Sequence, residues 1–319
     1  MLTGDHGLAG ERIHCFMSPR TLRLIINGKA VGNEELRQGV AALREAGHDV
    51  EVRVTWENGD ARRWAAEAGG AEVVVAAGGD GTVHEVLQGL MDRPAVERPA
   101  LGVVPMGTAN DLANGCGIPL GLPDALQLCA TGTPVPIDVA LANDHWFINA
   151  ASSGFGAEVT VNTPPELKRL LGGAAYTVMA ALLAINFKPS QGRLVFPDGE
   201  LHGSAVVAII GNGRQTGGKP VTPKALINDG LLDVLVIREV PASGLLQAGR
   251  ELQALEPDGE YIFYRQVPWV EFHPTEPMPI NLDGEPVNFA SVRYQTVSGA
   301  LRLIVPADCP ALVPPGALA

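Results

Sequence analysis

The sequence has few cysteines, and they are not arranged for cross-linking or metal binding. Its four thiols are scattered along the chain without a CxxC pair. Such spacing argues against a disulfide framework and favours reduced thiols in a cytoplasmic protein. No HExxH motif or paired histidine spacing occurs either, so a zinc site is not predicted. The cysteines are Cys15, Cys116, Cys129 and Cys309.

Basic residues are also scarce. The chain carries 23 lysines and arginines against 35 acidic residues, a formal net charge of −12. A surface of this sign repels nucleic-acid backbones, so we expect no nucleic-acid partner. It also disfavours a broad basic face for anionic membranes, although a local patch would still allow transient peripheral contact with the inner membrane face.

Long apolar runs are missing. Residues 1–20 lack an apolar core behind a basic start, so no secretory signal is predicted and this leader has no legible role. The longest uncharged run, 170–187, has 18 residues, whereas a membrane-spanning helix needs about 20. We expect a buried or partly exposed helix there, with a helix that lines a lipid pocket or rests on a bilayer as the alternative.

What the sequence does contain is glycine and proline, 38 and 25 residues, grouped around alternating apolar runs. Strand-like and helix-like stretches alternate after Thr21, which predicts an α/β domain with a parallel sheet covered by helices on both sides. The strands are expected near 22–26, 50–54, 73–77 and 101–104, and the helices near 34–46, 60–68, 83–91 and after 107–111.

The pattern changes near residue 147. Strand-like runs then dominate, and they predict a second, mainly antiparallel β domain that carries one helix over about 242–255. The runs at 193–196 and 205–210 flank a Pro-Asp-Gly-Glu turn and predict a hairpin. We therefore expect domains over 21–146 and 147–305, with the tail 306–319 returning to the first. Further strands are expected at 231–237, 261–272, 280–282 and 301–305.

Two glycine-rich loops follow strands of the predicted parallel sheet. They are 78–82 (GGDGT) and 107–111 (GTAND), and each precedes a helix. Glycine lets the backbone approach a ligand closely, and a helix N-terminus offers free N–H groups, so the pair predicts a phosphate site. A lone loop of this kind is weak evidence, and a tight strand-to-helix turn is the alternative. A third loop, 213–219, has G-x4-G-K spacing, but Pro220 stands where a P-loop needs a hydroxyl, so we keep it only as a loop that could line a ligand.

Acidic residues in two Asp-Gly segments are further candidates. In 281–285 two carboxylates stand two positions apart, and an extended segment would place both on one face, which suits a proton acceptor or a cation site. A solvated Asp-Gly turn is the favoured alternative. Asp229 is likewise a turn residue by default, and a magnesium or calcium ligand only with further oxygen donors nearby. His84 is expected as a surface residue at a helix start.

Taken together, these motifs resemble the YegS-type bacterial lipid kinases of the diacylglycerol kinase catalytic-domain family. The resemblance rests on five ordered segments and covers about residues 21–310. The five segments are 78–82, 105–113, 211–215, 228–232 and 282–286. Residues 54–57 (VTWE) and 148–149 add to the resemblance. The family implies an ATP-dependent kinase in which an α/β nucleotide-binding domain is followed by a β-sandwich domain for the lipid.

The resemblance also implies roles for single residues. Glu285 would accept the proton of the lipid hydroxyl, and Asp80 would orient or bind the catalytic magnesium. A structural Mg²⁺, or Ca²⁺ in its place, would be held by Asp229 and the backbone carbonyls of Leu226 and Leu231. Asn228 stands where the family often has a second acid. ATP would contact Thr55, Gly79, Asp80, Gly81, Thr82, Val83, His84, Glu85 and Thr108.

The expected function is transfer of the ATP γ-phosphoryl group to a hydroxyl of a lipid such as phosphatidylglycerol or diacylglycerol. The acceptor pocket is expected between the domains, lined partly by 170–187. A soluble-substrate kinase of the NAD kinase type shares the GGDG loop, but its GxLGF continuation and NE motif are absent. A protein that binds nucleotide or lipid without turnover is the remaining alternative.

Overall fold

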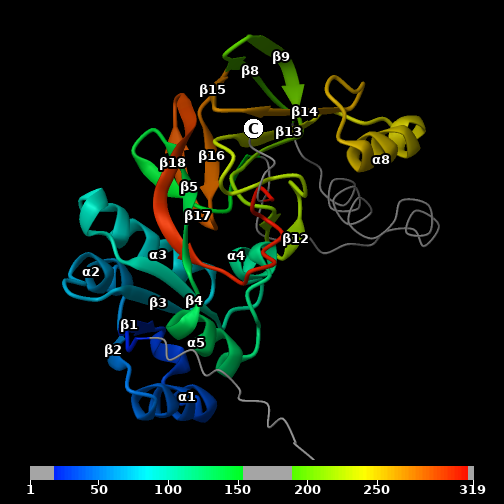
Figure 1. Ribbon diagram of the computed structural model, residues 1–319. Helices are drawn as coiled ribbons and strands as arrows, with labels where there is room; N and C mark the ends of the chain where they lie inside the picture. Colours follow the sequence, from blue (N-terminus) through cyan, green and yellow to red (C-terminus); the bar gives the residue numbers. More distant parts are fainter. Residues whose placement is uncertain (1–17, 154–188, 315–319) are drawn as a thin grey trace, which may run out of the picture.

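The computed structural model describes residues 18–153 and 189–314. They form two parts that share one continuous sheet (Figure 1). An α/β part occupies the lower half of the view, and a β-rich part lies above it. The expected fold class, an α/β domain with an antiparallel β-sandwich domain, is confirmed. The leader and the apolar run 170–187 lie outside the described residues, and the exact domain limits stay a prediction.

The α/β part is built on four parallel strands in the order β2-β1-β3-β4. All six residues of β3 and of β4 are buried, because helices cover both faces of the sheet. Helices α1 and α5 pack on one face, and α2, α3 and α4 on the other. The bounds are β1 Thr21–Ile26, α1 Glu34–Glu45, β2 Asp49–Val54, α2 Asp60–Ala66, β3 Val73–Gly78, α3 Asp80–Met91, β4 Ala100–Pro105, α4 Asp111–Cys116 and α5 Leu122–Thr131.

The β-rich part consists of two facing sheets with an apolar core between them. One has the order β14-β13-β10-β7-β16-β17, and the other continues the parallel sheet through β18, β15, β8 and β9. Helix α8 (Leu245–Ala254) packs outside the first sheet. The strands are β5 Pro134–Ala142, β6 His145–Phe147, β7 Ala150–Ser153, β8 Ser190–Phe196, β9 Gly199–Ala205, β10 Val207–Gly211, β13 Leu232–Ile237, β14 Ile262–Val267, β15 Trp269–Pro274, β16 Met278–Leu282, β17 Glu285–Phe289 and β18 Val292–Ile304.

Strand β18 joins the two parts. Its start pairs antiparallel with β15, whereas Leu303 near its end pairs parallel with Leu101 of β4. Strand β5 pairs along most of its length, with an irregularity between Val297 and Leu301. Because one strand belongs to both parts, the C-terminal half of the chain is fixed against the sheet that carries the glycine-rich loops.

Three boundaries differ from the sequence prediction. The hairpin partner of β8 is β9 at Gly199–Ala205, and the run near 207–211 instead pairs with β13 and β7. The run 261–272 is two strands, β14 and β15, in different sheets, because Pro268 lacks the N–H that would continue the ladder. The helix over 242–255 begins as a 3-10 turn and is α-helical only from Leu245.

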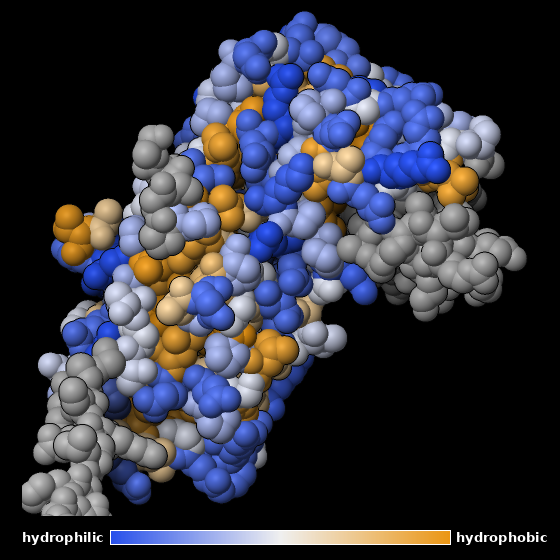
Figure 2. All heavy atoms as spheres, turned by 45° about the vertical axis from the view of Figure 1, so that its right-hand side comes forward, coloured by the Kyte–Doolittle hydropathy of each residue, from blue (hydrophilic) through white to orange (hydrophobic). Residues whose placement is uncertain are grey.

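Within the described residues, no helix is long and apolar enough to cross a membrane. Figure 2 shows hydrophilic side chains over most of one face, with apolar ones gathered in separate groups. The described end of the tail packs on the α/β part, where Cys309 and Ala311 join the core beside α4.

Candidate active site

The first glycine-rich loop turns β3 directly into α3. Gly79 is extended at the helix N-cap, and α3 begins at Asp80. The N–H groups of Asp80 and Gly81 donate to no described residue, so they stay free at the positive end of the helix. This is the arrangement that favours an anion such as a phosphate group.

The second glycine-rich loop lies against the first. A Cβ on Gly107 would come 2.5 Å from the Cα of Gly79, so the two backbones touch and glycine is required there. The Asp80 carboxylate accepts from the N–H groups of Asn110 (2.9 Å) and Asp111 (2.6 Å). Asn110 is left-handed (φ +49°), and its side chain bonds both backbone groups of Gly107. Both Asp80 oxygens thus join the loops.

The third loop, with its G-x4-G-K spacing, is fastened to the second. The Asp111 carboxylate accepts from the N–H groups of Gly217 (2.8 Å) and Gly218 (2.7 Å). Burial raises the pKa of Asp111, and these two hydrogen bonds oppose that rise. Because its glycine N–H groups are engaged by a carboxylate, this loop does not form a phosphate cradle of its own at these positions.

The Asp-Gly segment at 283–284 is a turn, as the favoured alternative predicted, and not part of an extended strand; Asp283 within it is buried and not solvated. Asp283 (φ +49°) and Gly284 (φ +102°) are both left-handed and connect β16 to β17 as a two-residue hairpin. Asp283 is 7% exposed and accepts from the backbone N–H groups of Ile148 (2.7 Å), Asn149 (2.8 Å) and Ala150 (3.0 Å). The two carboxylates therefore have different environments.

Glu285 is the exposed member of that pair. It is the first residue of β17, and its carboxylate makes no hydrogen bond or ion pair with any residue that the structure describes. An acid without a partner is available to a ligand, whereas the Asp283 carboxylate already accepts three backbone hydrogen bonds.

His84 brings the turn and the phosphate loop together. Its Nδ1 lies 3.4 Å from Oδ2 of Asp283, and its side chain is only 13% exposed. The expectation of a surface histidine is therefore wrong: one turn into α3, the ring packs under the 283–284 turn. Gln88, on the next turn of α3, donates to the carbonyl of Trp146 at 2.7 Å. The start of α3 and the hairpin that carries Glu285 are thus neighbours.

The other residues implied to contact ATP occupy different positions. The Thr55 hydroxyl accepts from the N–H of Gly28 (3.1 Å), and Thr108 is exposed with no partner among the described residues. Thr82 is buried, and its hydroxyl accepts a hydrogen bond of 3.3 Å from the Asn27 side chain. Val83 is a core residue. Glu85 accepts from the N–H groups of Gly59 (3.0 Å) and Ala61 (3.2 Å), so it caps α2.

The segment implied to hold a structural cation offers oxygen ligands. Asp229 uses Oδ1 to accept from the N–H of Leu231 (3.0 Å), and its other oxygen has no described donor. The carbonyl oxygens of Leu226 and Leu231 accept no hydrogen bond from the described residues. Burial raises the pKa of Asp229, and the nearby Asp138 charge adds to that rise. A hard divalent cation fits this donor set.

Asp138 was missed at the level of sequence. Its buried carboxylate accepts from the N–H groups of Gly230 (2.6 Å) and Gly299 (2.9 Å) and so fixes the loop that contains Asp229. The sequence did contain a signal, because Asp138 lies within the apolar run of β5. An acid in such a run is expected to be buried, and a buried carboxylate needs hydrogen-bond partners.

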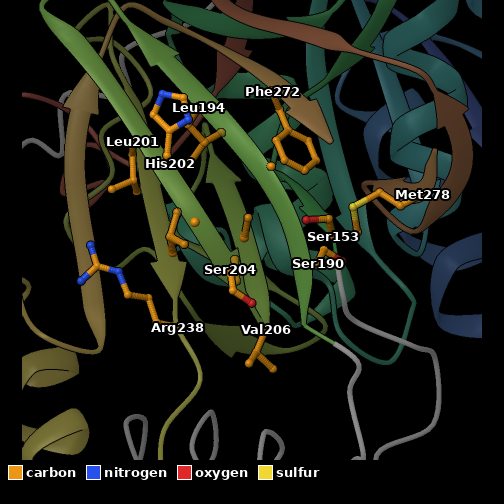
Figure 3. Close-up of a pocket in the computed structure, with 15 residues that line it drawn as sticks. Ser153, Ser190, Leu194, Leu201, His202, Ser204, Val206, Arg238, Phe272 and Met278 are labelled. Carbon is orange, nitrogen blue, oxygen red and sulfur yellow. The ribbon is translucent and has the colours of Figure 1, made fainter. Parts of the chain in front are cut away.

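A pocket opens between the two sheets of the β-sandwich (Figure 3). The pocket is partly open to solvent, and its cavity volume is about 40 Å³. Polar side chains including Ser204 and His202 also border it. Strands β7 and β16, which help to line it, lead at their other ends to Ala150 and to the 283–284 turn. Its apolar lining includes Leu194, Leu201, Ala208, Val236, Phe272 and Met278.

Comparison with known proteins identifies both parts of the chain. Residues 21–142 match the family model of the diacylglycerol kinase catalytic domain, and residues 149–305 match that of the YegS C-terminal NAD kinase β-sandwich-like domain. A protein of Chromohalobacter salexigens named "Probable lipid kinase YegS-like" is 47% identical over 89% of this chain and 92% of its own. A Shewanella frigidimarina protein of the same name is 40% identical over 92% of this chain and 96% of its own.

The fold agrees with this assignment. The crystal structure of a diacylglycerol kinase from Bacillus anthracis str. Sterne superposes with a TM-score of 0.74 at 26% identity, over 91% of this chain and 98% of that one. The motifs, the fold and the relatives all indicate the same group. The chain belongs to the family of YegS-like lipid kinases, phosphotransferases with an alcohol acceptor and a diacylglycerol kinase catalytic domain.

Proposed function

We propose that this lipid kinase transfers the γ-phosphoryl group of ATP to a hydroxyl of a lipid such as diacylglycerol or phosphatidylglycerol. The observation that carries the proposal is the contact between His84, in the first turns of α3, and Asp283, in the hairpin that presents Glu285. This contact supports a site in which the start of α3 and the hairpin that carries Glu285 act together.

The phosphate end is preorganised. Asp80 holds the two glycine-rich loops together, and the free N–H groups of Asp80 and Gly81 face the ligand position at the start of α3. Phosphoryl transfer depends mainly on positioning and on stabilisation of negative charge, which such fixed donors supply. Thr55 and Thr108 would add hydroxyl contacts from the neighbouring strand ends.

Glu285 is the proton acceptor in this proposal. Its carboxylate is exposed and unpaired among the described residues, so it is available to a lipid hydroxyl. As the hydroxyl oxygen attacks the γ-phosphorus, Glu285 takes the hydroxyl proton and the bond to the ADP oxygen breaks. General base catalysis of this kind contributes about 10²–10⁴-fold to a rate.

Divalent cations fit two places in the proposal. Mg²⁺, or Ca²⁺ in its place, would bind Asp229 with the carbonyls of Leu226 and Leu231 and would hold that loop. A catalytic Mg²⁺ bound with ATP would neutralise phosphate charge. Both oxygens of the Asp80 carboxylate accept hydrogen bonds from backbone N–H groups. Asp80 therefore positions the two glycine-rich loops, in addition to any contact that it would make with the cation.

The lipid chain has a candidate site in the pocket between the sheets. Met278 lines that pocket, and β16 runs from it to Leu282 beside the turn, a rise of roughly 14 Å. A cavity of about 40 Å³ is smaller than an acyl chain, and Ile280 and Leu282 are packed in the core, so a lipid tail would enter only if the two sheets moved apart. The implied contribution of 170–187 lies outside the described residues.

The test is a substrate panel with labelled ATP. The protein is incubated with diacylglycerol, phosphatidylglycerol or a sphingoid base in detergent micelles, and with NAD⁺ in a separate arm, and the products are identified by mass spectrometry. The proposal expects a labelled lipid product, with diacylglycerol or phosphatidylglycerol as the expected acceptor. Labelled NADP⁺, or nucleotide binding without any ADP release, would refute it. The partners expected are ATP and lipid at a transiently contacted membrane, without nucleic acid.

A further inference from the structure

Trp56 exposes almost its whole side chain. It is 94% exposed, although tryptophan carries a large apolar surface that folded proteins usually cover. Val96 is equally exposed at 96%, but it precedes β4, at the amino end of the parallel sheet. Trp56 follows β2 at the carboxyl end, the edge at which open α/β sheets bind ligands.

The backbone around Trp56 is held firmly although its ring is free. The N–H groups of Trp56 (2.7 Å) and Glu57 (3.1 Å) both donate to Oδ2 of Asp60. The Glu85 carboxylate accepts from Gly59, and the Thr55 N–H donates to Ile26 at 2.9 Å. Because the loop backbone is already ordered, binding of a ligand that stacks on this ring would cost little conformational entropy of the loop.

The distance from Trp56 to the phosphate loop suits a nucleotide. The sheet order is β2-β1-β3, so the ends of β2 and β3 are two strand spacings apart, about 10 Å. Among the described residues, the turn at Asn27 and Gly28 follows β1 and therefore lies between them. An extended nucleoside triphosphate with its β- and γ-phosphates at Gly81 would span β1 and bring its base to the end of β2.

We propose that Trp56 is the platform on which the adenine base of ATP stacks, so that it sets nucleotide affinity while the glycine-rich loops bind the phosphates. This inference rests on the proposed use of ATP and adds the residue that receives the base. The loop that carries Trp56 is acidic, because Glu57 follows it in sequence and the carboxylates of Asp60 and Glu85 accept hydrogen bonds from the loop backbone, although Asp60 also pairs with Arg63. This charge disfavours the other common role of an exposed tryptophan, insertion between anionic lipid head groups.

The test compares W56A, W56F and V96A by calorimetric titration with ADP in the absence of lipid. Stacking of a base on an aromatic ring contributes about 1–3 kcal/mol, so W56A should bind ADP about 5- to 150-fold more weakly. W56F should keep part of the affinity, and V96A should match the wild type. Inorganic tripolyphosphate, which has no base, should bind W56A and the wild type equally.

Two further readouts separate the possible outcomes. ADP should quench tryptophan fluorescence in the wild type but not in W56F, which keeps the other three tryptophans. If W56A bound ADP as tightly as the wild type but lost binding to phosphatidylglycerol vesicles, Trp56 would be a membrane anchor and the inference would be overturned. A wild-type protein that bound no nucleotide would overturn the proposed function as well, whereas unchanged ADP affinity in W56A overturns only the stacking role.

Discussion

Replacement of Asp283 should lower the free energy of unfolding. It leaves Glu285, the proposed proton acceptor two residues away, unchanged. Its carboxylate accepts three backbone hydrogen bonds from Ile148, Asn149 and Ala150 while only 7% exposed. In Asp283→Ala these three donors lose their acceptor, and each unsatisfied buried donor costs about 1–3 kcal/mol. We expect a loss of about 3–5 kcal/mol in the free energy of unfolding, at the low end of the sum because water reaches part of the gap.

Urea denaturation measures this loss, with the slope compared between variants so that a change in midpoint reports stability. Asp283→Asn should lose about half as much free energy of unfolding. The oxygen of its carboxamide can still accept hydrogen bonds, whereas its NH₂ group cannot accept from the backbone N–H groups on its side. Glu285→Ala is the matched control in the same hairpin. With no described partner it should lie within about 0.5 kcal/mol of the wild type. An Asp283→Ala protein as stable as this control would refute the role of Asp283 as the anchor of the hairpin.

Two further predictions concern the loops and the buried acids. Gly107→Ala places a Cβ 2.5 Å from the Cα of Gly79, so the loops must separate. We expect at least a tenfold rise in KM for ATP, with unchanged kinetics in Gly32→Ala, whose Cβ would meet no atom within 4 Å. Burial raises the pKa of Asp233 from 3.8 to about 6, although the Tyr264 hydroxyl donates to it. The folded state thus holds the proton more tightly, and stability falls by about 3 kcal/mol in total as pH rises from well below 3.8 to well above 6. Asp233→Asn should remove that fall, so its stability relative to the wild type should be greater at pH 7 than at pH 4.5; an equal difference at both pH values would contradict this.

The parts of the fold that could be predicted from sequence are those set by neighbours in the chain. The apolar runs of β3 and β4 read as buried parallel strands, and the glycines after them marked the two loops. By contrast, the break between β14 and β15 was missed, although Pro268 signalled it. Strand β5 was not predicted, since prolines at 134 and 136 hide a run that pairs along β18.

The site divides in the same way. Local motifs identified Asp80, Asp283 and Glu285, but not that Asp80 joins two loops or that Asp283 is buried. Those roles depend on partners far along the chain, 30 residues away for Asp80 and 135 for the bond between Ile148 and Asp283. Spacing within a motif cannot show whether a carboxylate faces a ligand or a distant backbone. Asp138 was overlooked for the same reason.

The most direct test of the account is phosphoryl transfer by Glu285→Gln, measured with labelled ATP and the accepted lipid. Glutamine keeps the size of the side chain but cannot accept the hydroxyl proton as a carboxylate does. We predict a 10²- to 10⁴-fold loss of turnover with unchanged ADP affinity and unchanged unfolding free energy. Turnover equal to the wild type in a protein that still binds ADP would contradict the central claim that Glu285 is the proton acceptor facing the phosphate loop.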